Sequence, residues 1–153
     1  MSQAPKFLIN FADIDMSAST PIEALHAIAR LGLRKELVKE GWHNAVLARE
    51  QEFPTGLPTP IPVAIPHTDS MYVKADGIGF FRLKNPVSFG EMGSTDQFIN
   101  VQIIIPLLIT DHEKQVDLLM TVIAAVQDEE FVAKLNIAAD IDAVAKLFAS
   151  KNL

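Results

Sequence analysis

Residues 49–70 read REQEFPTGLPTPIPVAIPHTDS, and this stretch determines how the rest of the chain is interpreted. Five of the chain's nine prolines lie between Pro54 and Pro66. Proline fixes φ and favours an extended conformation in the residue before it, so this segment should be stiff and mostly non-helical. We expect Val63–Ile65 to form a short strand that ends at Pro66. His67 would then lie at the end of a strand, where binding groups often occur in open α/β sheets.

The residues before this stretch predict a helix over Trp42–Phe53. Arg49 lies three residues after Val46 and four before Phe53, which assigns it to the inward face of that helix. The apolar residues of this face are Trp42, Ala45, Val46 and Phe53. A guanidinium does not lose its proton and is costly to bury alone, so Arg49 requires an anion from the protein or from a ligand.

The N-terminal part predicts a strand over Phe7–Phe11 and then a helix. Thr20 is suited to the N-cap, Pro21 to the first helical position, and Glu23 to the second half of a capping box. Gly32 is a plausible residue for the C-cap of this helix.

The second half of the chain alternates strands with helices. Gly77–Leu83 is expected to be a strand, Pro86–Phe89 an edge strand, and Phe98–Ile109 a buried central strand broken or bent at Pro106. Residues 110–113 repeat the capping-box pattern before a further helix. Its expected inward residues are Val116, Leu119, Met120 and Ile123, with His112 at the start of the same face.

Two more helices are expected, over Asp128–Leu135 and Asp140–Phe148, each with an acidic start. With no internal repeat and no linker, residues 1–153 are expected to form a single domain. The order of elements predicts an α/β fold, a mixed β-sheet sandwiched between helices on both faces.

The composition excludes several classes of function. The net charge is −6, and no basic run suggests nucleic-acid or membrane-surface binding. The chain contains no cysteine, which excludes disulfides, thiolate catalysis and zinc–thiolate sites. No signal peptide is recognisable, and the longest apolar run, Phe98–Ile109, is too short and too interrupted to insert into a membrane. We therefore expect a soluble, cytoplasmic protein.

His67, Arg49 and His112 are the candidate catalytic residues. Phosphoryl transfer requires mainly alignment and charge stabilisation, which a nucleophilic imidazole beside a guanidinium and a second imidazole would supply. A helix N-terminus at His112 also favours a bound anion. The alternative is that Arg49 pairs with an acidic neighbour and His112 is a buried helix-start residue. The acidic neighbours in question are Glu50, Glu52 and Asp69.

Other kinds of site have little support in the sequence. Asp69 could orient the His67 ring, or it could cap a following turn. No nucleotide-binding, metalloprotease or serine-hydrolase motif occurs, so no cofactor and no metal site are expected. A metal-dependent hydrolase would have to combine His67, His112 and Asp69 by the accident of folding.

Three groups of residues together resemble a known family. Ala48-Arg49-Glu50, then Phe53-Pro54-Thr55-Gly56, then Ala64-Ile65-Pro66-His67 are similar to the IIA domains of the bacterial phosphoenolpyruvate-dependent sugar phosphotransferase system. The resemblance is to the mannitol/fructose class, and within it to the galactitol-type IIA proteins. Thr68 departs from the glycine that many mannitol-type sequences carry after the histidine.

The resemblance implies that His67 is phosphorylated by phospho-HPr and passes the group to a cysteine of a sugar-specific IIB protein. Arg49 matches the arginine that stabilises the phosphoryl oxygens, and His112 matches a second active-site histidine of mannitol-type members. Thr55 matches a threonine of the motif, and Glu50 and Asp69 are further candidates for binding. The IIB and membrane-bound IIC functions would lie on other chains, and no cofactor would be needed. A regulatory module of the same fold, controlled by its phosphorylation state, is the alternative function.

Overall fold

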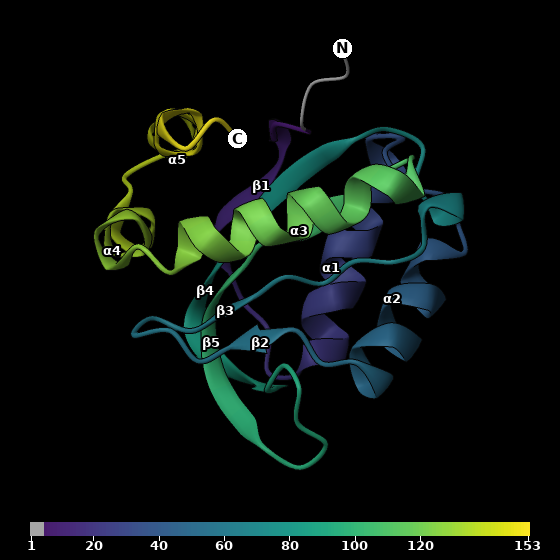
Figure 1. Cartoon of the computed structure of the whole chain (residues 1–153), viewed down its shortest axis with the longest axis horizontal. Helices are drawn as coiled ribbons and strands as arrows, with labels where there is room; N and C mark the ends of the chain where they lie inside the picture. Colours follow the sequence, from purple (N-terminus) through teal and green to yellow (C-terminus); the bar gives the residue numbers. More distant parts are fainter. Residues whose placement is uncertain (1–4) are drawn as a thin grey trace.

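A mixed sheet runs through the centre of the molecule, with helices on both of its faces (Figure 1). The computed structural model describes residues 5–153. Its elements are β1 (Phe7–Met16), α1 (Pro21–Arg34), α2 (Trp42–Glu52), β2 (Gly56–Leu57), β3 (Val63–Ala64), a 3₁₀ turn (Ser70–Tyr72), β4 (Gly77–Gly90), β5 (Phe98–Ile104), β6 (Leu107–Leu108), α3 (His112–Val126), α4 (Glu129–Ile137) and α5 (Ile141–Ser150).

The strand order is β1-β4-β5-β3-β2, and β6 pairs with the first residues of β4. The β1–β4 and β3–β5 pairs are parallel, whereas β4–β5 and β2–β3 are antiparallel. The β3–β5 pairing places Val63 beside Ile103, so the strand that leads to His67 lies next to a central strand. This position explains why β3 is buried despite its length of two residues.

Side-chain alternation along the strands separates the core into two layers. In β4, Ile78 and Phe80 pack toward α3, α4 and α5, whereas Phe81 and Leu83 pack toward α1 and α2. Successive residues of a strand point to opposite faces, so a strand buried on both faces is apolar throughout. The predicted fold class, a mixed β-sheet sandwiched between helices on both faces, is confirmed (Figure 1).

The strand predictions are correct in place but wrong in extent. Pro86–Phe89 is not a separate strand, because β4 runs without a break from Gly77 to Gly90. This second part of β4 does lie at an edge, since it pairs with β5 whereas the pairing with β1 ends at Leu83. Pro86 lies in an irregular part of the pairing with β5, between Arg82 and Val87. Because the regular ladder is interrupted there, the absence of an N–H on proline costs no hydrogen bond between the strands. The chain is interrupted at Pro106, as expected, and this break separates β5 from β6.

Helix α1 begins as predicted but does not end at Gly32. The Thr20 hydroxyl accepts a hydrogen bond from the Glu23 N–H at 3.1 Å, which confirms the N-cap. Gly32 is buried inside the helix, where a Cβ would lie 3.1 Å from the Val38 side chain. The chain turns at Glu36 instead, in the left-handed conformation with φ of 57°.

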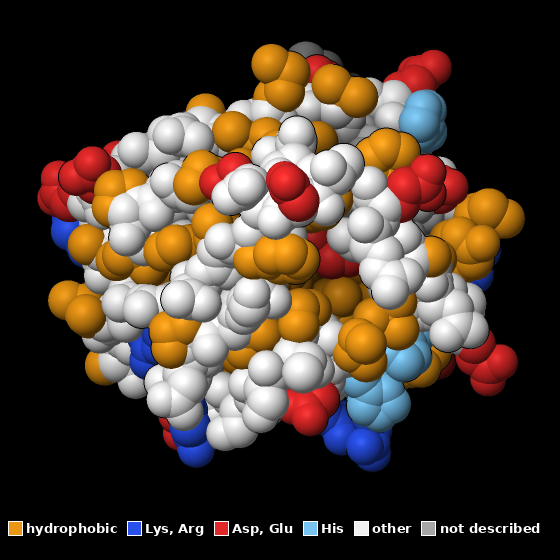
Figure 2. All heavy atoms as spheres, turned by 90° about the horizontal axis from the view of Figure 1, so that it is seen from below, with side chains coloured by type: hydrophobic (Ala, Val, Ile, Leu, Met, Phe, Trp, Pro, Cys, Tyr) orange, Lys and Arg blue, Asp and Glu red, His pale blue; other side chains and the backbone are white. Residues whose placement is uncertain are grey.

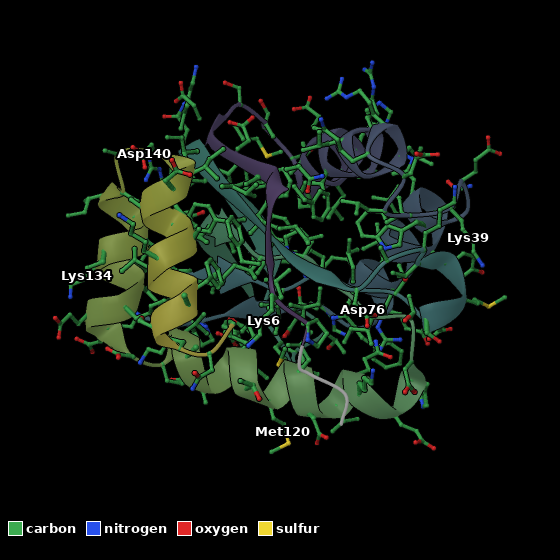
Figure 3. All side chains as sticks on the ribbon, turned by 90° about the horizontal axis from the view of Figure 1, so that it is seen from above. Lys6, Lys39, Asp76, Met120, Lys134 and Asp140 are labelled. Atoms are coloured by element: carbon green, nitrogen blue, oxygen red, sulfur yellow. The ribbon has the colours of Figure 1, made fainter. Side chains whose placement is uncertain are left out.

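The predicted inward face of α3 is wrong in part. Val116 and Met120 are exposed, and the Met120 side chain projects away from the sheet (Figure 3). The buried positions are Gln115, Leu118, Val122, Ala125 and Val126. Apolar residues occur at helical spacing on two faces of this helix, so spacing alone does not identify the buried one. The buried face is the one that contains Gln115. The N-cap is Asp111, not Thr110, whose N–H and hydroxyl both donate to Asp76.

Helices α4 and α5 begin one residue after the predicted starts, since Asp128 and Asp140 act as their N-caps. Within residues 5–153, no helix has both the length and the apolar character needed to cross a bilayer.

Candidate active site

His67 lies at the end of the segment that follows β3, inside a cavity of about 440 Å³. The backbone on either side of it is fixed, because Pro66 O accepts from the Leu107 N–H at 3.0 Å and Thr68 O accepts from the Gln115 amide at 3.0 Å. The His67 side chain is 6% exposed, and what it exposes faces a cavity that Arg49 also lines. The predicted strand before His67 is present but ends at Ala64, one residue earlier than expected, and His67 is the third residue after it.

One ring nitrogen of His67 is occupied by the protein. Nδ1 lies 2.8 Å from the carbonyl oxygen of Ile65, and a carbonyl oxygen only accepts hydrogen bonds. Nδ1 must therefore carry the proton, which leaves the lone pair of the neutral ring on Nε2. The geometry leaves Nε2 as the ring nitrogen that carries the lone pair.

The surroundings of His67 favour its neutral form. Burial is the largest cause that lowers the pKa of His67 below its ordinary value, and the Arg49 charge lowers it further. The hydrogen bond to Ile65 and the charge of Asp69 act in the opposite direction but are outweighed. At neutral pH the ring is unprotonated at Nε2 and able to attack an electrophile.

Arg49 lies in the last turn of α2 and lines the same cavity as His67. It is not fully inward as the helical pattern predicted, because its side chain is 36% exposed. Its nearest acidic partner is Asp69 at 3.8 Å, and its guanidinium lies 5.7 Å from the centre of the Phe53 ring. Among the described residues its buried Nε has no hydrogen-bond partner. A loosely paired guanidinium with a spare donor is well suited to bind an anion.

Glu50, the next residue, is the buried acid of α2. It is 9% exposed, and both of its carboxylate oxygens accept hydrogen bonds from Thr55: from the N–H at 2.6 Å and from the hydroxyl at 2.7 Å. Thr55 also accepts from the Ile65 N–H at 3.1 Å. Burial raises the pKa of Glu50 to about 7, despite the two hydrogen bonds from Thr55 that lower it.

This raised pKa predicts an unusual dependence of stability on pH. The folded protein holds the Glu50 proton more tightly than the unfolded chain, whose ordinary value is 4.5, so the contribution to stability is complete below 4.5 and lost as pH rises to about 7. Glu50→Gln lacks this proton. In urea titrations from about pH 5 to about pH 8, its free energy of unfolding should rise relative to the wild type by about 3 kcal/mol.

His67 is present in both proteins, and its titration is followed by NMR in each so that its contribution can be subtracted from this difference. Parallel stability curves for wild type and Glu50→Gln would contradict the raised pKa of Glu50.

Not all the candidate residues from the sequence line the cavity. Arg49, Thr55 and His67 do, together with Leu119 of α3 and residues 92–95 of the β4–β5 connection. His112 is exposed at the first residue of α3 and is not part of the lining. The residue of α3 that reaches the His67 segment is Gln115, which the sequence prediction missed. Its only signal was a polar residue at helical spacing from Leu118 and Val122.

The arrangement predicted for a metal-dependent hydrolase is not formed. Within the part of the chain that the structure describes, no three His, Cys, Asp or Glu side chains come together in a group that could hold a metal ion. Asp69 instead lies beside Arg49.

A second cavity, of about 490 Å³, lies on the other side of Glu50, between the start of α1, the second half of α2 and the end of β4. Glu50 is the one ionisable side chain among the residues that line it. Seen from the end of the molecule that carries the β4–β5 connection, hydrophobic side chains surround a hollow with a recessed acidic side chain (Figure 2). The two cavities share Pro54, Ser94 and Thr95.

The chain is similar to known proteins in both sequence and fold. Residues 7–151 match the family described as "Phosphoenolpyruvate-dependent sugar phosphotransferase system, EIIA 2". The galactitol-specific EIIA component of the phosphotransferase system of Escherichia coli K12 is 32% identical over 114 residues, which cover 74% of this chain and 75% of that protein.

Solved structures share the fold at lower identity. One is the complex of the mannitol enzyme IIA with phosphorylated enzyme IIB from Escherichia coli, with a TM-score of 0.75 and 22% identity over 95% of this chain and 99% of that one. Another is the nitrogen regulatory protein IIA-Ntr from Neisseria meningitidis, with a TM-score of 0.74 and 19% identity over 93% of this chain and 95% of that one. From its sequence match and its fold, the chain belongs to the EIIA 2 family of the phosphoenolpyruvate-dependent sugar phosphotransferase system.

Proposed function

We propose that this protein is a cytoplasmic phosphocarrier for carbohydrate uptake that receives a phosphoryl group on His67 from phospho-HPr and passes it to a cysteine of a cognate IIB protein. The observation that carries the proposal is the His67 ring, which lies in one cavity with Arg49. Its Nδ1 is bonded to Ile65, and its Nε2 has no hydrogen-bond partner among residues 5–153. No cofactor takes part in either transfer.

In the first transfer, the Nε2 lone pair of His67 attacks the phosphorus of the donor phosphohistidine. A new N–P bond forms as the donor's N–P bond breaks, and the donor imidazole leaves with the electron pair. The chemistry needs alignment and stabilisation of charge on the phosphoryl oxygens. Arg49 supplies that charge, and its loose contact with Asp69 at 3.8 Å can be exchanged for the phosphoryl oxygens.

The second transfer reverses the role of His67. A thiolate attacks the phosphorus, an S–P bond forms, and His67 leaves with the electron pair of the broken N–P bond. Because these 153 residues contain no cysteine, the thiolate must come from outside them, and we propose that IIB supplies it and that IIC carries the sugar across the membrane. Neither nucleic acid nor direct membrane insertion has a part in this scheme.

The remaining candidate residues have supporting roles in this proposal. Thr55 lines the cavity beside His67, and Asp69 holds Arg49 while no phosphoryl group is bound. His112, on the exposed start of α3, is retained as a second imidazole that a phosphorylated partner could meet on docking.

The proposal is tested by incubating the chain with phosphoenolpyruvate, enzyme I and HPr. We expect an adduct that is labile in acid and stable in base, and its loss when a IIB protein with a reactive cysteine is added. Failure to take up the label would refute the carrier function. Uptake without onward transfer to any IIB cysteine would instead favour the regulatory alternative.

Transient docking should use exposed apolar residues on the elements that line the cavity or follow His67 in the chain. We call Phe53, Met71, Val116 and Met120 the apolar rim, all of which are exposed. The sequence suggests an apolar docking patch around His67 formed by Phe53, Leu57, Ile61 and Met71. In the fold Leu57 is buried and Ile61 packs against the core, so these two are not available for docking. Central apolar contacts carry most of the binding energy of an interface.

We expect Val116→Asp to reduce kcat/KM for transfer from phospho-HPr by about tenfold, because a charge in an apolar interface costs on the order of 1–2 kcal/mol. An acidic residue near the start of α3 is compatible with the helix dipole, so folding is preserved. Ile137→Asp, which is 78% exposed on α4, is the matched control and should transfer normally. Equal rates for the two variants would exclude Val116 from the docking surface.

A further inference from the structure

A continuous path of hydrogen bonds leads from Glu50 to the ring of His67. The Thr55 hydroxyl donates to Glu50 Oε1 at 2.7 Å, and the Thr55 N–H donates to Oε2 at 2.6 Å. The Ile65 N–H donates to Thr55 Oγ1 at 3.1 Å, and His67 Nδ1–H donates to Ile65 O at 2.8 Å. The two polar ends of one residue, Ile65, therefore connect the carboxylate to the imidazole.

Every side chain of this path is removed from water. Thr55 is 3% exposed, and Glu50, Ile65 and His67 are also buried. A buried hydroxyl donates one hydrogen bond, and here the proton of Thr55 is committed to the carboxylate. Its oxygen is thereby oriented to accept from the Ile65 N–H, and the carbonyl of Ile65 fixes which nitrogen of His67 is protonated.

We propose that Glu50, acting through Thr55, is a positioning residue that holds the Ile65 carbonyl toward His67 Nδ1 and so keeps the Nε2 lone pair directed into the cavity. This inference rests on the phosphoryl transfer proposed above for its kinetic consequence, but the ring tautomer can be observed without it.

The arrangement depends on the charge of Glu50. An ionised carboxylate only accepts, so both oxygens can take a hydrogen bond from Thr55. Protonation makes one oxygen a donor, which competes with the Thr55 hydroxyl for the same contact and weakens the hold on Ile65. Burial raises the pKa of Glu50 to about 7, so this change occurs near neutral pH.

Few charges surround Glu50 to alter this titration. From α1 and β4, and from the β4–β5 connection, the residues that line the cavity beside it are uncharged. Residues 53–65, the segment that contains Thr55 and ends at Ile65, are uncharged as well. On α2, its neighbour Arg49 faces the other cavity, with His67. Thr55 is therefore its principal polar partner.

The direct test is the tautomer of His67, read from the imidazole nitrogen resonances of the full chain by NMR. In the wild type we expect a protonated Nδ1 and an unprotonated Nε2. Thr55→Val, which removes the hydroxyl, should produce a mixture of tautomers, and Thr55→Ser should restore the wild-type signal. Thr59→Val is the matched control, since Thr59 is a buried threonine whose hydroxyl donates to Ile61 O, outside this path.

The kinetic test uses phosphoramidate, a small donor that needs no protein partner. His67 Nε2 attacks its phosphorus, the donor's P–N bond breaks, and ammonia leaves. Thr55→Val should be phosphorylated about tenfold more slowly than the wild type. Thr55→Ser and Thr59→Val should stay close to wild type.

The pH profile separates positioning from general structural support. We express the rate of Glu50→Gln relative to wild type at each pH, so that protonation of the donor cancels, and the protonated fraction of His67 is measured in each protein by NMR and divided out. Below the pKa of Glu50 the wild type should slow, whereas the variant has no carboxyl group to protonate. The rate of Glu50→Gln divided by that of the wild type should therefore rise as the pH falls through neutrality. The ratio for Thr59→Val should be flat.

An unchanged tautomer in both Thr55→Val and Glu50→Gln, or a flat rate ratio for Glu50→Gln, would overturn the positioning role. If Thr55→Val does not fold, Glu50→Gln still decides it, since this variant should also give a mixture of tautomers. If the wild type accepts no phosphoryl group at all, the carrier function fails, and the NMR result alone decides whether Glu50 and Thr55 fix the ring.

Discussion

His67→Ala should take up no acid-labile phosphoryl label from phosphoenolpyruvate, enzyme I and HPr, a loss on the order of 10³-fold or more. The reason is chemical: in the proposed mechanism the Nε2 lone pair forms the new N–P bond, and no other side chain of the cavity is an imidazole. The label is measured on the isolated chain after removal of HPr.

Loss of a buried side chain also costs stability, about 1–3 kcal/mol, so the fold of the variant must be checked by circular dichroism. His67→Gln, which keeps more of the volume, should be equally inactive. His26→Ala removes an exposed histidine of α1 and should be labelled like the wild type. A label that persists in both His67 variants would refute the assignment of His67.

Arg49→Ala should slow phosphorylation by about 10²–10³-fold, the usual effect of removing one preorganised group that stabilises transition-state charge. Its unfolding free energy should change by less than about 1 kcal/mol, because the contact with Asp69 is long and half-exposed. Stopped-flow transfer from phospho-HPr and urea denaturation measure the two quantities.

Arg49→Lys should recover only part of the rate, since an ammonium keeps the charge but not the planar fork of donors. Arg30→Ala, on the exposed face of α1, is the control and should transfer normally. A rate for Arg49→Ala within about twofold of the wild type would exclude its role in stabilising the phosphoryl group.

The part of the site that is local in sequence was predictable. Pro66 and the short strand before it place His67 within a few residues, and the end of α2 places Arg49. The resemblance to IIA domains rests on the same segments, residues 48–56 and 64–67. Backbone geometry imposed by proline is a local property, so it can be read from sequence.

The connection between these segments was not predictable from pattern. Glu50 was considered as a partner of Arg49, but in the fold it accepts both hydrogen bonds of Thr55. Arg49 instead lies beside Asp69. Helical spacing predicts the direction in which a side chain points from the helix axis. It does not predict which residues of a neighbouring loop will contact that side chain.

The same limit explains the errors on α3. Val116 and Met120 appeared inward because they are apolar at helical spacing, yet the fold buries Gln115 on the other face to bind Thr68 O. A polar residue is buried where a partner satisfies it, and that partner lies 47 residues away in the sequence.

The sequence by itself determined the order of helices and strands, the fold class, and the strand end that carries His67, because these follow from side-chain periodicity, caps and proline. Tertiary structure alone decided which face of α3 is buried, that Gly77–Gly90 is one long strand, and that Arg49 lies beside Asp69. Each of these depends on contacts between segments distant in sequence, whose free energies exceed the local preferences of the residues involved.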